Sequence, residues 1–183
     1  MDKSMKKGES LFKEGDSGMI WRVEYGAIQL QKTTRHGVVL TQLALPGDII
    51  GLEGLWNKPY ANSAVALVQS KLSRQGLSGE LNAFAAVAEG YMQQQQRMQD
   101  MSILRTGSVA SRLEHLIQML ARGQDGHRHK LDRKDLPTLR EMSQIMDIAR
   151  ATICRELKAI FPRASRTYQS QATASNDALA MAS

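Results

Sequence analysis

Cysteine is almost absent from this chain of 183 residues, which carries Cys154 alone. A single thiol cannot close a disulfide or build a multi-cysteine metal cluster within one chain. A disulfide scaffold is therefore excluded within one chain, and an iron–sulfur sensor is not supported. The histidines are scattered: His36 lies in an expected turn, and His127 and His129 flank an arginine without cysteine or carboxylate ligands at a metal-binding spacing. We therefore expect no metal and no cofactor, haem included.

Long hydrophobic runs are missing as well. No stretch of about eighteen apolar residues occurs, and residues 1–10 lack the apolar segment of a signal peptide, so a cytoplasmic location without a membrane span is expected. The β-rich part of the sequence lacks the clustered His and Glu ligands of iron-dependent cupin enzymes, so we do not expect an enzyme. The hydrophobic fraction of 42% still allows packed cores in one large or two small domains.

Acidic residues are outnumbered in the C-terminal half, where the net charge of +6 is concentrated. Residues 105–168 contain 13 Lys and Arg against 7 Asp and Glu, whereas residues 1–104 contain 11 against 10. A localised excess of positive charge is typical of a protein that binds a polyanion, with an affinity that falls as salt rises. A basic surface that merely keeps the protein soluble is the alternative.

Short strands account for the first part of the chain. Apolar and polar residues alternate in short segments, and glycine-containing turns separate these segments at near-regular intervals. This pattern predicts an all-β barrel or jelly roll, with strands at residues 10–13, 19–23, 27–33, 38–43 and 63–72.

A long helix is predicted at residues 77–104. Its seam positions recur at spacings of three and four residues, the pattern of a two-stranded coiled coil: Leu81, Phe84, Ala88, Tyr91, Gln95, Met98 and Ser102. Polar seam positions and Gly90 weaken the middle of the helix. Gly107 then ends it, and Ser108 caps a supporting helix that reaches Gly123. The seam predicts a homodimer. Packing of this helix on its own β-domain is the alternative, and partial packing on both is expected.

Two short amphipathic helices are predicted at residues 138–161, TLREMSQIMDIARATICRELKAIF. The break falls at residues 147–149, where Asp147 is a residue type that tolerates the positive φ of a tight corner. On the second helix basic side chains lie roughly opposite an apolar face, formed by Ile153, Leu157 and Ile160. This pattern is typical of a helix-turn-helix whose second helix enters the major groove of DNA. An ordinary helical hairpin with a solvated basic face is the alternative.

This segment resembles the helix-turn-helix of the CRP/FNR family, the transcription factors named after the cyclic-AMP receptor protein and the fumarate-nitrate reductase regulator. The match runs through Thr138, Glu141, Arg150, Thr152, Ile153, Arg155, Leu157 and Lys158. The departures are Ser143 at a small-residue position, Asp147 for the corner glycine and Ala149 for a Ser or Thr cap. A second resemblance, to the sensor β-roll of the family, involves Gly15, Gly26, Pro46-Gly47-Asp48 and the GLEGLW run at residues 51–56.

The resemblance implies an α+β fold with an N-terminal β-roll of the cyclic-nucleotide-binding type, a jelly roll, as the sensor domain at residues 1–76. A dimerisation helix at 77–106 and a helix-turn-helix DNA-binding domain at 107–168 would follow. Residues 169–183, rich in Ser and Ala, are expected to form a disordered tail. The implied partners are double-stranded DNA, a second copy of the chain, RNA polymerase and a small-molecule effector of unknown identity.

In the family, the GLEGLW region and a later Arg-Ser pair hold the phosphate of a cyclic nucleotide. Here Leu52 occupies the position of the ribose-binding glutamate, and Asn62 occupies the position of the arginine. A buried phosphate without its arginine is costly, so we predict that the protein does not respond to cyclic AMP. The remaining candidates for binding an effector are Gly51, Glu53, Ser63 and Arg97. Of these, Arg97 is a candidate contact for an anionic effector.

The resemblance also implies the residues that contact DNA. On the second helix these are Arg150, Ala151, Thr152, Cys154, Arg155 and Lys158. Thr138 and Arg140, at the start of the first helix, are expected to anchor phosphates. Arg155 is the leading candidate for a bidentate contact with guanine, and Ala151 replaces a glutamate that often reads cytosine in the family.

The sequence therefore predicts a homodimeric transcriptional regulator that reads an inverted-repeat operator, with recognition helices one DNA turn, about 34 Å, apart. Two alternatives stay open. One is a DNA-binding regulator whose β-roll senses nothing, and the other is a dimeric scaffold protein that does not bind DNA.

Overall fold

The computed structural model describes residues 2–76, 78–123 and 131–161. All strands precede the long helices, so the predicted order of an N-terminal β-domain followed by helices is confirmed. The predicted tail at 169–183 lies outside the described residues, as do His127 and His129.

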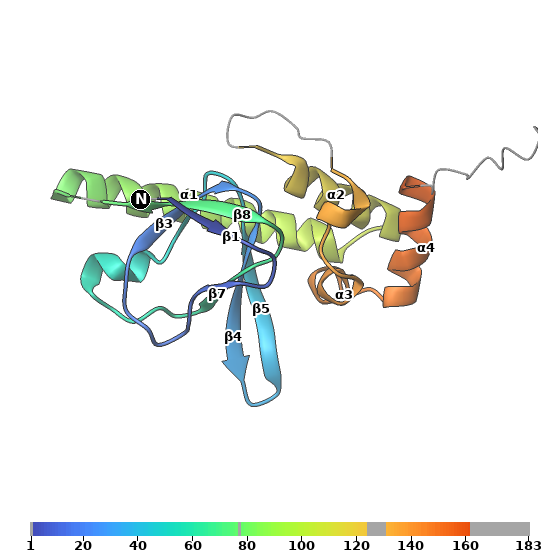
Figure 1. The fold of residues 1–183 in the computed structure, drawn as a ribbon, viewed down its shortest axis with the longest axis horizontal. Helices are drawn as coiled ribbons and strands as arrows, with labels where there is room; N and C mark the ends of the chain where they lie inside the picture. Colours follow the sequence, from blue (N-terminus) through green and yellow to red (C-terminus); the bar gives the residue numbers. More distant parts are fainter. Residues whose placement is uncertain (1, 77, 124–130, 162–183) are drawn as a thin grey trace, which may run out of the picture.

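Two antiparallel four-stranded sheets form the β-roll (Figure 1). The first has the order β1 (Asp2–Met5), β8 (Ser70–Gln75), β3 (Ile20–Tyr25) and β6 (Ile49–Ile50). The second has the order β2 (Ser10–Phe12), β7 (Ser63–Ala66), β4 (Ile28–Thr34) and β5 (Gly37–Ala44). Because side chains alternate between the two faces of a strand, each sheet contributes inward-facing apolar residues to a common core: Met5, Val23, Ile28, Ala44, Ile50, Ala64, Ala66 and Leu72.

The predicted strands at 10–13, 19–23, 27–33 and 38–43 correspond to β2, β3, β4 and β5. The prediction of a single strand at 63–72 is wrong, because the chain changes sheets at residues 67–69: β7 pairs with β4, and β8 pairs with β3. Strands β1 and β6 were not predicted. β1 directs only Met5 into the core, and β6 is too short to show an alternating pattern.

Within the described ranges, four α-helices follow the β-roll: α1 (Glu80–Arg105), α2 (Val109–Ala121), α3 (Leu139–Met146) and α4 (Arg150–Ile160). Helix α1 runs along the long axis of the molecule, from beside the sheets to the other three helices (Figure 1). It begins later than predicted because Gly79, with φ 89°, is not helical. The predicted cap of α2 is confirmed, since the Ser108 hydroxyl accepts a hydrogen bond of 3.2 Å from the Ser111 amide.

One apolar core connects the β-roll to the helices. Its β-roll members are Ala27, Leu43, Leu45 and Leu67, and its helical members include Leu104, Leu113, Leu116, Met119, Met142, Ile145, Met146, Ile153 and Leu157. Of the three residues predicted to form the apolar face of α4, Ile153 and Leu157 are buried, whereas Ile160 is 43% exposed. Phe161, one residue later, packs against the core.

Candidate functional site

Helices α3 and α4 are joined by a tight turn at residues 147–149. Asp147 adopts the left-handed conformation with φ 54°, as predicted, and its amide donates to the Ser143 carbonyl. A residue other than glycine in this conformation costs roughly 1–2 kcal/mol. Ala149, at the N-cap of α4, offers no side-chain oxygen to the first turn, and the lack of such a cap costs about 1 kcal/mol.

Arg112 of α2 contacts this turn from a distant part of the sequence. Its Nη1 donates to the Met146 carbonyl over 3.2 Å, and its Nε donates to the Gly107 carbonyl over 3.0 Å. Met146 is the last residue of α3, so its carbonyl has no partner within the helix. Reasoning from sequence alone did not identify Arg112, because its contact with Met146 joins residues 34 positions apart.

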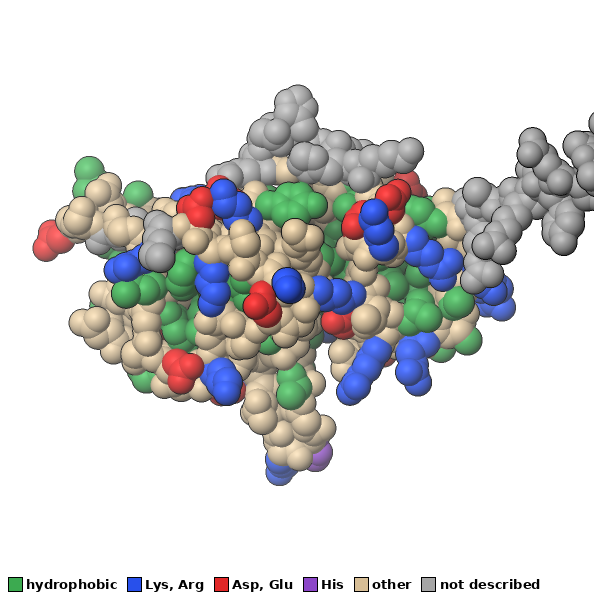
Figure 2. Space-filling model, viewed as in Figure 1, with side chains coloured by type: hydrophobic (Ala, Val, Ile, Leu, Met, Phe, Trp, Pro, Cys, Tyr) green, Lys and Arg blue, Asp and Glu red, His purple; other side chains and the backbone are tan. Residues whose placement is uncertain are grey.

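The two faces of α4 differ in chemistry. Ile153 and Leu157 are buried in the core, whereas Arg150, Arg155 and Lys158 are exposed and take part in none of the described ion pairs. Of the other predicted contact residues, Ala151 is exposed, and Thr152 and Cys154 are partly buried. Figure 2 shows Lys and Arg side chains gathered over the end of the molecule that carries α3 and α4.

The start of α3 carries the two predicted phosphate anchors. The Thr138 hydroxyl accepts from the Glu141 amide over 3.2 Å, while the Glu141 carboxylate accepts from the Thr138 amide over 2.6 Å, which forms a capping box. Lys7 of the β-roll pairs with Glu141 over 3.3 Å and donates to the Leu136 carbonyl over 3.1 Å. Thr138 and Arg140 are both exposed, and they line a hollow of about 300 Å³ beside strand β5.

The GLEGLW segment forms a turn at Gly51, with φ 76°, and a 3-10 helix at Leu52–Trp56. A Cβ atom on Gly51 would lie 2.9 Å from the ring of Tyr60, so both the conformation and the packing favour glycine there. Leu52 packs against Gly90 of α1, where a Cβ would lie only 2.5 Å from Leu52 Cδ1. Gly90 therefore makes room for Leu52 on the inner side of α1.

Glu53 and Ser63, two of the predicted effector residues, are engaged within the chain. The Glu53 carboxylate accepts from the Ala61 amide over 3.0 Å, and the Ser63 hydroxyl accepts from the Glu14 amide over 2.9 Å. Asn62, at the position where the family has arginine, shares a hydrogen bond of 3.0 Å with the Thr41 hydroxyl. These polar groups hold neighbouring backbone segments together.

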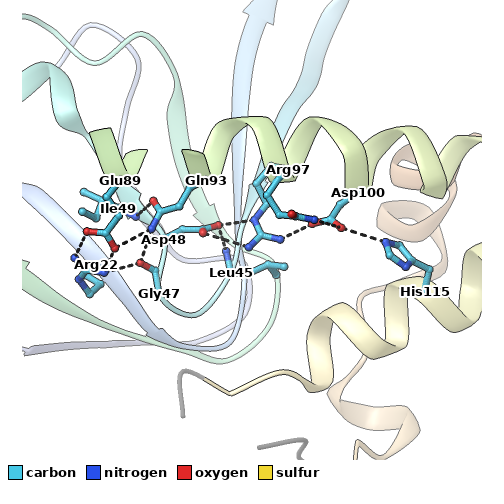
Figure 3. A network of polar contacts seen from close by, with 11 residues as sticks. Arg22, Leu45, Gly47, Asp48, Ile49, Glu89, Gln93, Arg97, Asp100 and His115 are labelled. Carbon is cyan, nitrogen blue, oxygen red and sulfur yellow. Dashed lines mark hydrogen bonds and ion pairs between the residues drawn. The ribbon is translucent and has the colours of Figure 1, made fainter. Parts of the chain in front are cut away.

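Arg97, the fourth predicted effector residue, is buried, with only 7% of its surface exposed. Its Nε donates to Asp48 over 2.8 Å, and its Nη1 pairs with Asp100 (Figure 3). None of the described contacts joins it to Gly51, Glu53 or Ser63. The structure therefore does not bring the four predicted residues into contact with one another. The Arg97 guanidinium is instead paired with two carboxylates of the same chain.

Asp48, Arg97 and Asp100 form a buried ion cluster between the turn before β6 and helix α1. Burial raises the pKa of the Asp48 carboxyl, and the contact with Arg97 only partly offsets this effect. His115 of α2 places Nε2 at 3.4 Å from Asp100, yet the geometry is not a hydrogen bond, and this nitrogen has no hydrogen-bond partner within the described part of the chain.

A second ionic contact fastens α1 to the β-roll. Arg22 and Glu89 form a bidentate pair with distances of 2.7 and 2.9 Å. The hydrogen bond from Arg22 lowers the pKa of Glu89. Gln93 completes the contact by donating to the Gly47 carbonyl and accepting from the Ile49 amide (Figure 3).

The predicted coiled-coil seam of α1 lies on the side away from these contacts. Its large members are strongly exposed: Leu81 by 80%, Phe84 by 72%, Tyr91 by 61% and Met98 by 60%. The expected packing of α1 on the chain's own β-domain is also confirmed, but it uses the opposite side of the helix and leaves the seam exposed.

Across residues 2–76, 78–123 and 131–161, no cluster of three or more His, Cys, Asp or Glu side chains is suited to hold a metal ion. Within the same ranges, no helix is long and apolar enough to cross a bilayer.

Comparison with known proteins identifies the β-roll. The family described as cyclic nucleotide-binding domain matches residues 2–79. The transcriptional activator protein anr of Pseudomonas aeruginosa is 38% identical over 65 residues, which are 34% of this chain and 27% of that protein. The matched part thus spans about a quarter of that relative.

Solved structures extend the likeness to most of the chain. TTHB099, a transcriptional regulator of the CRP family from Thermus thermophilus, has a TM-score of 0.65 at 21% identity, over 86% of this chain and 83% of that one. FixK2 from Bradyrhizobium japonicum has a TM-score of 0.62 at 18% identity, over 87% and 83% of the respective chains. At these identities the structures establish a shared fold. Together with the domain match at residues 2–79, they show a β-roll of the cyclic nucleotide-binding type followed by helices, a fold that this chain shares with solved regulators of the CRP/FNR type.

Proposed function

We propose that this protein is a homodimeric regulator that binds double-stranded DNA through α4. The observation that carries the proposal is the free basic face of α4. Arg150, Arg155 and Lys158 project from a helix that follows a tight turn, and none of the described carboxylates pairs with them. Unpaired cations on one helical face match the phosphates and guanine edges of a major groove.

Helix α1 supports the dimeric form. Its exposed seam presents large apolar side chains at coiled-coil spacing, and an exposed apolar face of this kind is expected to be covered by a partner. A second copy of α1 would bury the same residues on both chains, as a two-fold interface requires. Such a dimer would present two copies of α4 to an inverted-repeat operator. RNA polymerase would be a further partner of the DNA-bound dimer.

The β-roll differs from a cyclic-AMP sensor at two positions of the expected phosphate and ribose site. Leu52 is directed to α1, and Asn62 replaces an arginine, so these positions do not offer the charge that a cyclic phosphate needs. We therefore propose a β-roll at 1–76 that does not respond to cyclic AMP, a dimerisation helix at 77–106 and a DNA-binding domain at 107–168. Any effector at Gly51, Glu53, Ser63 or Arg97 would have to displace contacts within the chain.

The test is binding of the full chain to a random duplex at several salt concentrations, followed by selection of bound genomic fragments. We expect affinity to fall steeply as salt rises, because bound phosphates release counterions. The selected fragments should contain an inverted repeat with half-site centres about one helical turn apart. Absence of binding in dilute buffer would favour the dimeric scaffold and overturn the proposal.

A further inference from the structure

The turn that sets the direction of α4 lacks two local stabilising features. Asp147 occupies a left-handed position where glycine is free of strain. Ala149 stands at an N-cap position where a Ser or Thr hydroxyl would bind the free amides of the first turn. The local sequence therefore holds the angle between α3 and α4 less firmly than a Gly and Ser pair would.

A contact from outside the turn offsets this weakness. The half-buried Arg112 donates from Nη1 to the Met146 carbonyl, immediately before Asp147, and from Nε to the Gly107 carbonyl. The two acceptors belong to different parts of the fold, since Gly107 ends the α1 segment with φ 84° and Met146 ends α3. A planar guanidinium can donate in both directions at once, which a lysine ammonium on a flexible stem does less rigidly.

The positive charge of Arg112 suits this place for a second reason. The carbonyl groups at the C-terminus of a helix carry a partial negative charge, so a cation beside the last carbonyl of α3 is favoured. A hydrogen bond from a charged donor is also stronger than one from a neutral donor.

We propose that Arg112 is a positioning residue that sets the orientation of the recognition helix α4, in place of the glycine and the hydroxyl cap that this turn lacks. This inference rests on the proposed DNA binding of α4 for its functional consequence. Its structural part, the dependence of the turn on Arg112, stands without it. Arg112 need not touch DNA, because it acts through the carbonyl at the end of α3.

The experiment compares the wild type with Arg112→Ala, Arg112→Lys and the rescued variant Arg112→Ala/Asp147→Gly/Ala149→Ser. Amide hydrogen exchange at residues 147–152 reports on the turn, and affinities for the selected operator and for a random duplex report on DNA binding. We expect faster exchange and about a tenfold loss of operator affinity in Arg112→Ala. Arg112→Lys should lie between, and the rescued variant should return close to the wild type.

Arg122→Ala is the matched control, because Arg122 is an exposed arginine at the end of the same helix. It removes the same charge, so it should leave hydrogen exchange at residues 147–152 unchanged and reduce affinity only slightly and equally for both duplexes. Equal losses in the control and in Arg112→Ala, or no recovery in the rescued variant, would overturn the proposal. If the wild type binds no duplex, the proposed function fails, while hydrogen exchange still decides whether Arg112 holds the turn.

Discussion

Helices α1 and α4 differ in the side chains that they expose. The inner side of α4 is apolar, with Ile153 and Leu157 in the core, and its outer side is basic. The inner side of α1 buries Ala86 and Leu104 together with the ion-paired Arg97 and Asp100. Its outer side exposes large apolar residues such as Phe84 and Tyr91.

The difference bears on the partner proposed for each helix. An outer basic face gains little by burial but attracts a polyanion, which is consistent with the proposed DNA contact of α4. Removing an outer apolar face from water lowers the free energy by about 25 cal/mol per Å². This is consistent with the proposed contact of α1 with a protein surface. The buried charges of α1 fasten it to the β-roll and leave the seam free for a partner.

The largest effect is expected on the inner side of α1. Arg97→Ala would leave Asp48 and Asp100 buried without their common cation. Removing one partner of a buried ion pair costs about 3–5 kcal/mol, and we expect a loss of that size in the free energy of unfolding. Urea denaturation at a fixed protein concentration measures it.

Arg105→Ala serves as the control for this variant, since Arg105 is an exposed arginine in the last turn of the same helix. Its removal should cost no more than about 1 kcal/mol, the usual contribution of a cation near a helix C-terminus. Similar losses in both variants would contradict the structural importance of the buried cluster.

The second effect concerns the outer side of α1. Tyr91→Glu/Met98→Glu places two carboxylates on the seam of each chain, so the dimer loses apolar burial and gains repulsion. Each buried side chain of this size contributes about 1.5–3 kcal/mol, so the dimer dissociation constant should rise at least about a hundredfold. Sedimentation equilibrium distinguishes one chain from two.

Val38→Glu is the matched control, because Val38 is an apolar side chain of β5 with a similar exposure of 57%. It should leave the dimer intact. A double variant that stays dimeric, or a wild type that is monomeric at high concentration, would show that α1 is not the dimer interface.

The third effect concerns the outer side of α4. Arg155→Ala should weaken binding to the selected operator by about 1–3 kcal/mol, the usual contribution of a bidentate contact with guanine. The fold should be unaffected, since Arg155 is exposed and forms none of the described ion pairs. Fluorescence anisotropy with labelled operator measures the change.

Arg74→Ala, which removes an exposed arginine from strand β8 of the β-roll, controls for the loss of one positive charge. It should reduce affinity only slightly and equally for all duplexes. If Arg155→Ala and Arg74→Ala bind the operator equally well, Arg155 does not read the DNA sequence.

The smallest effect is a dependence of stability on pH. Because the pKa of Asp48 is raised by burial, the folded chain holds a proton there more tightly than the unfolded chain does. Between the ordinary pKa and the raised one, the free energy of unfolding therefore falls as pH rises. Asp48→Asn removes the titrating group, so this part of the slope should vanish in urea denaturation at a series of pH values.

Asp2→Asn provides the comparison for the pH series, because the exposed Asp2 has its pKa lowered by a hydrogen bond from Lys71. Its contribution to the slope would have the opposite sign and should be small, since water screens the pair. An unchanged slope in Asp48→Asn would mean that Asp48 does not titrate in this range.

The elements predicted from the sequence are those whose signals lie within a few neighbouring residues. The alternation of β4, the seam of α1, the Ser108 cap and the left-handed Asp147 each depend on residues within a few positions of one another. The change of sheet between β7 and β8 has no such signal, because residues 63–72, SAVALVQSKL, contain no Gly, Pro, Asn or Asp that would mark a turn.

The candidate site was only partly accessible from the sequence. The basic residues of α4 follow from helical periodicity, and their exposure agrees with it. Arg97 was expected to be available to an anionic effector, because nothing near it in the sequence except Asp100 suggests a partner. Its second carboxylate, Asp48, lies 49 residues away and reaches it only through the packing of α1 on the β-roll.

The sequence by itself determined strands β2 to β5, helices α1 to α4, where the turn of residues 147–149 falls, the seam of α1 and the basic face of α4. Interactions within about four residues control these features, so they can be read along the chain. Tertiary structure alone decided which side of α1 is covered, that Arg97 is neutralised and that Arg112 supports the α3–α4 turn. Each of these depends on groups that only the folded chain brings into contact, since burial and hydrogen bonding act through space.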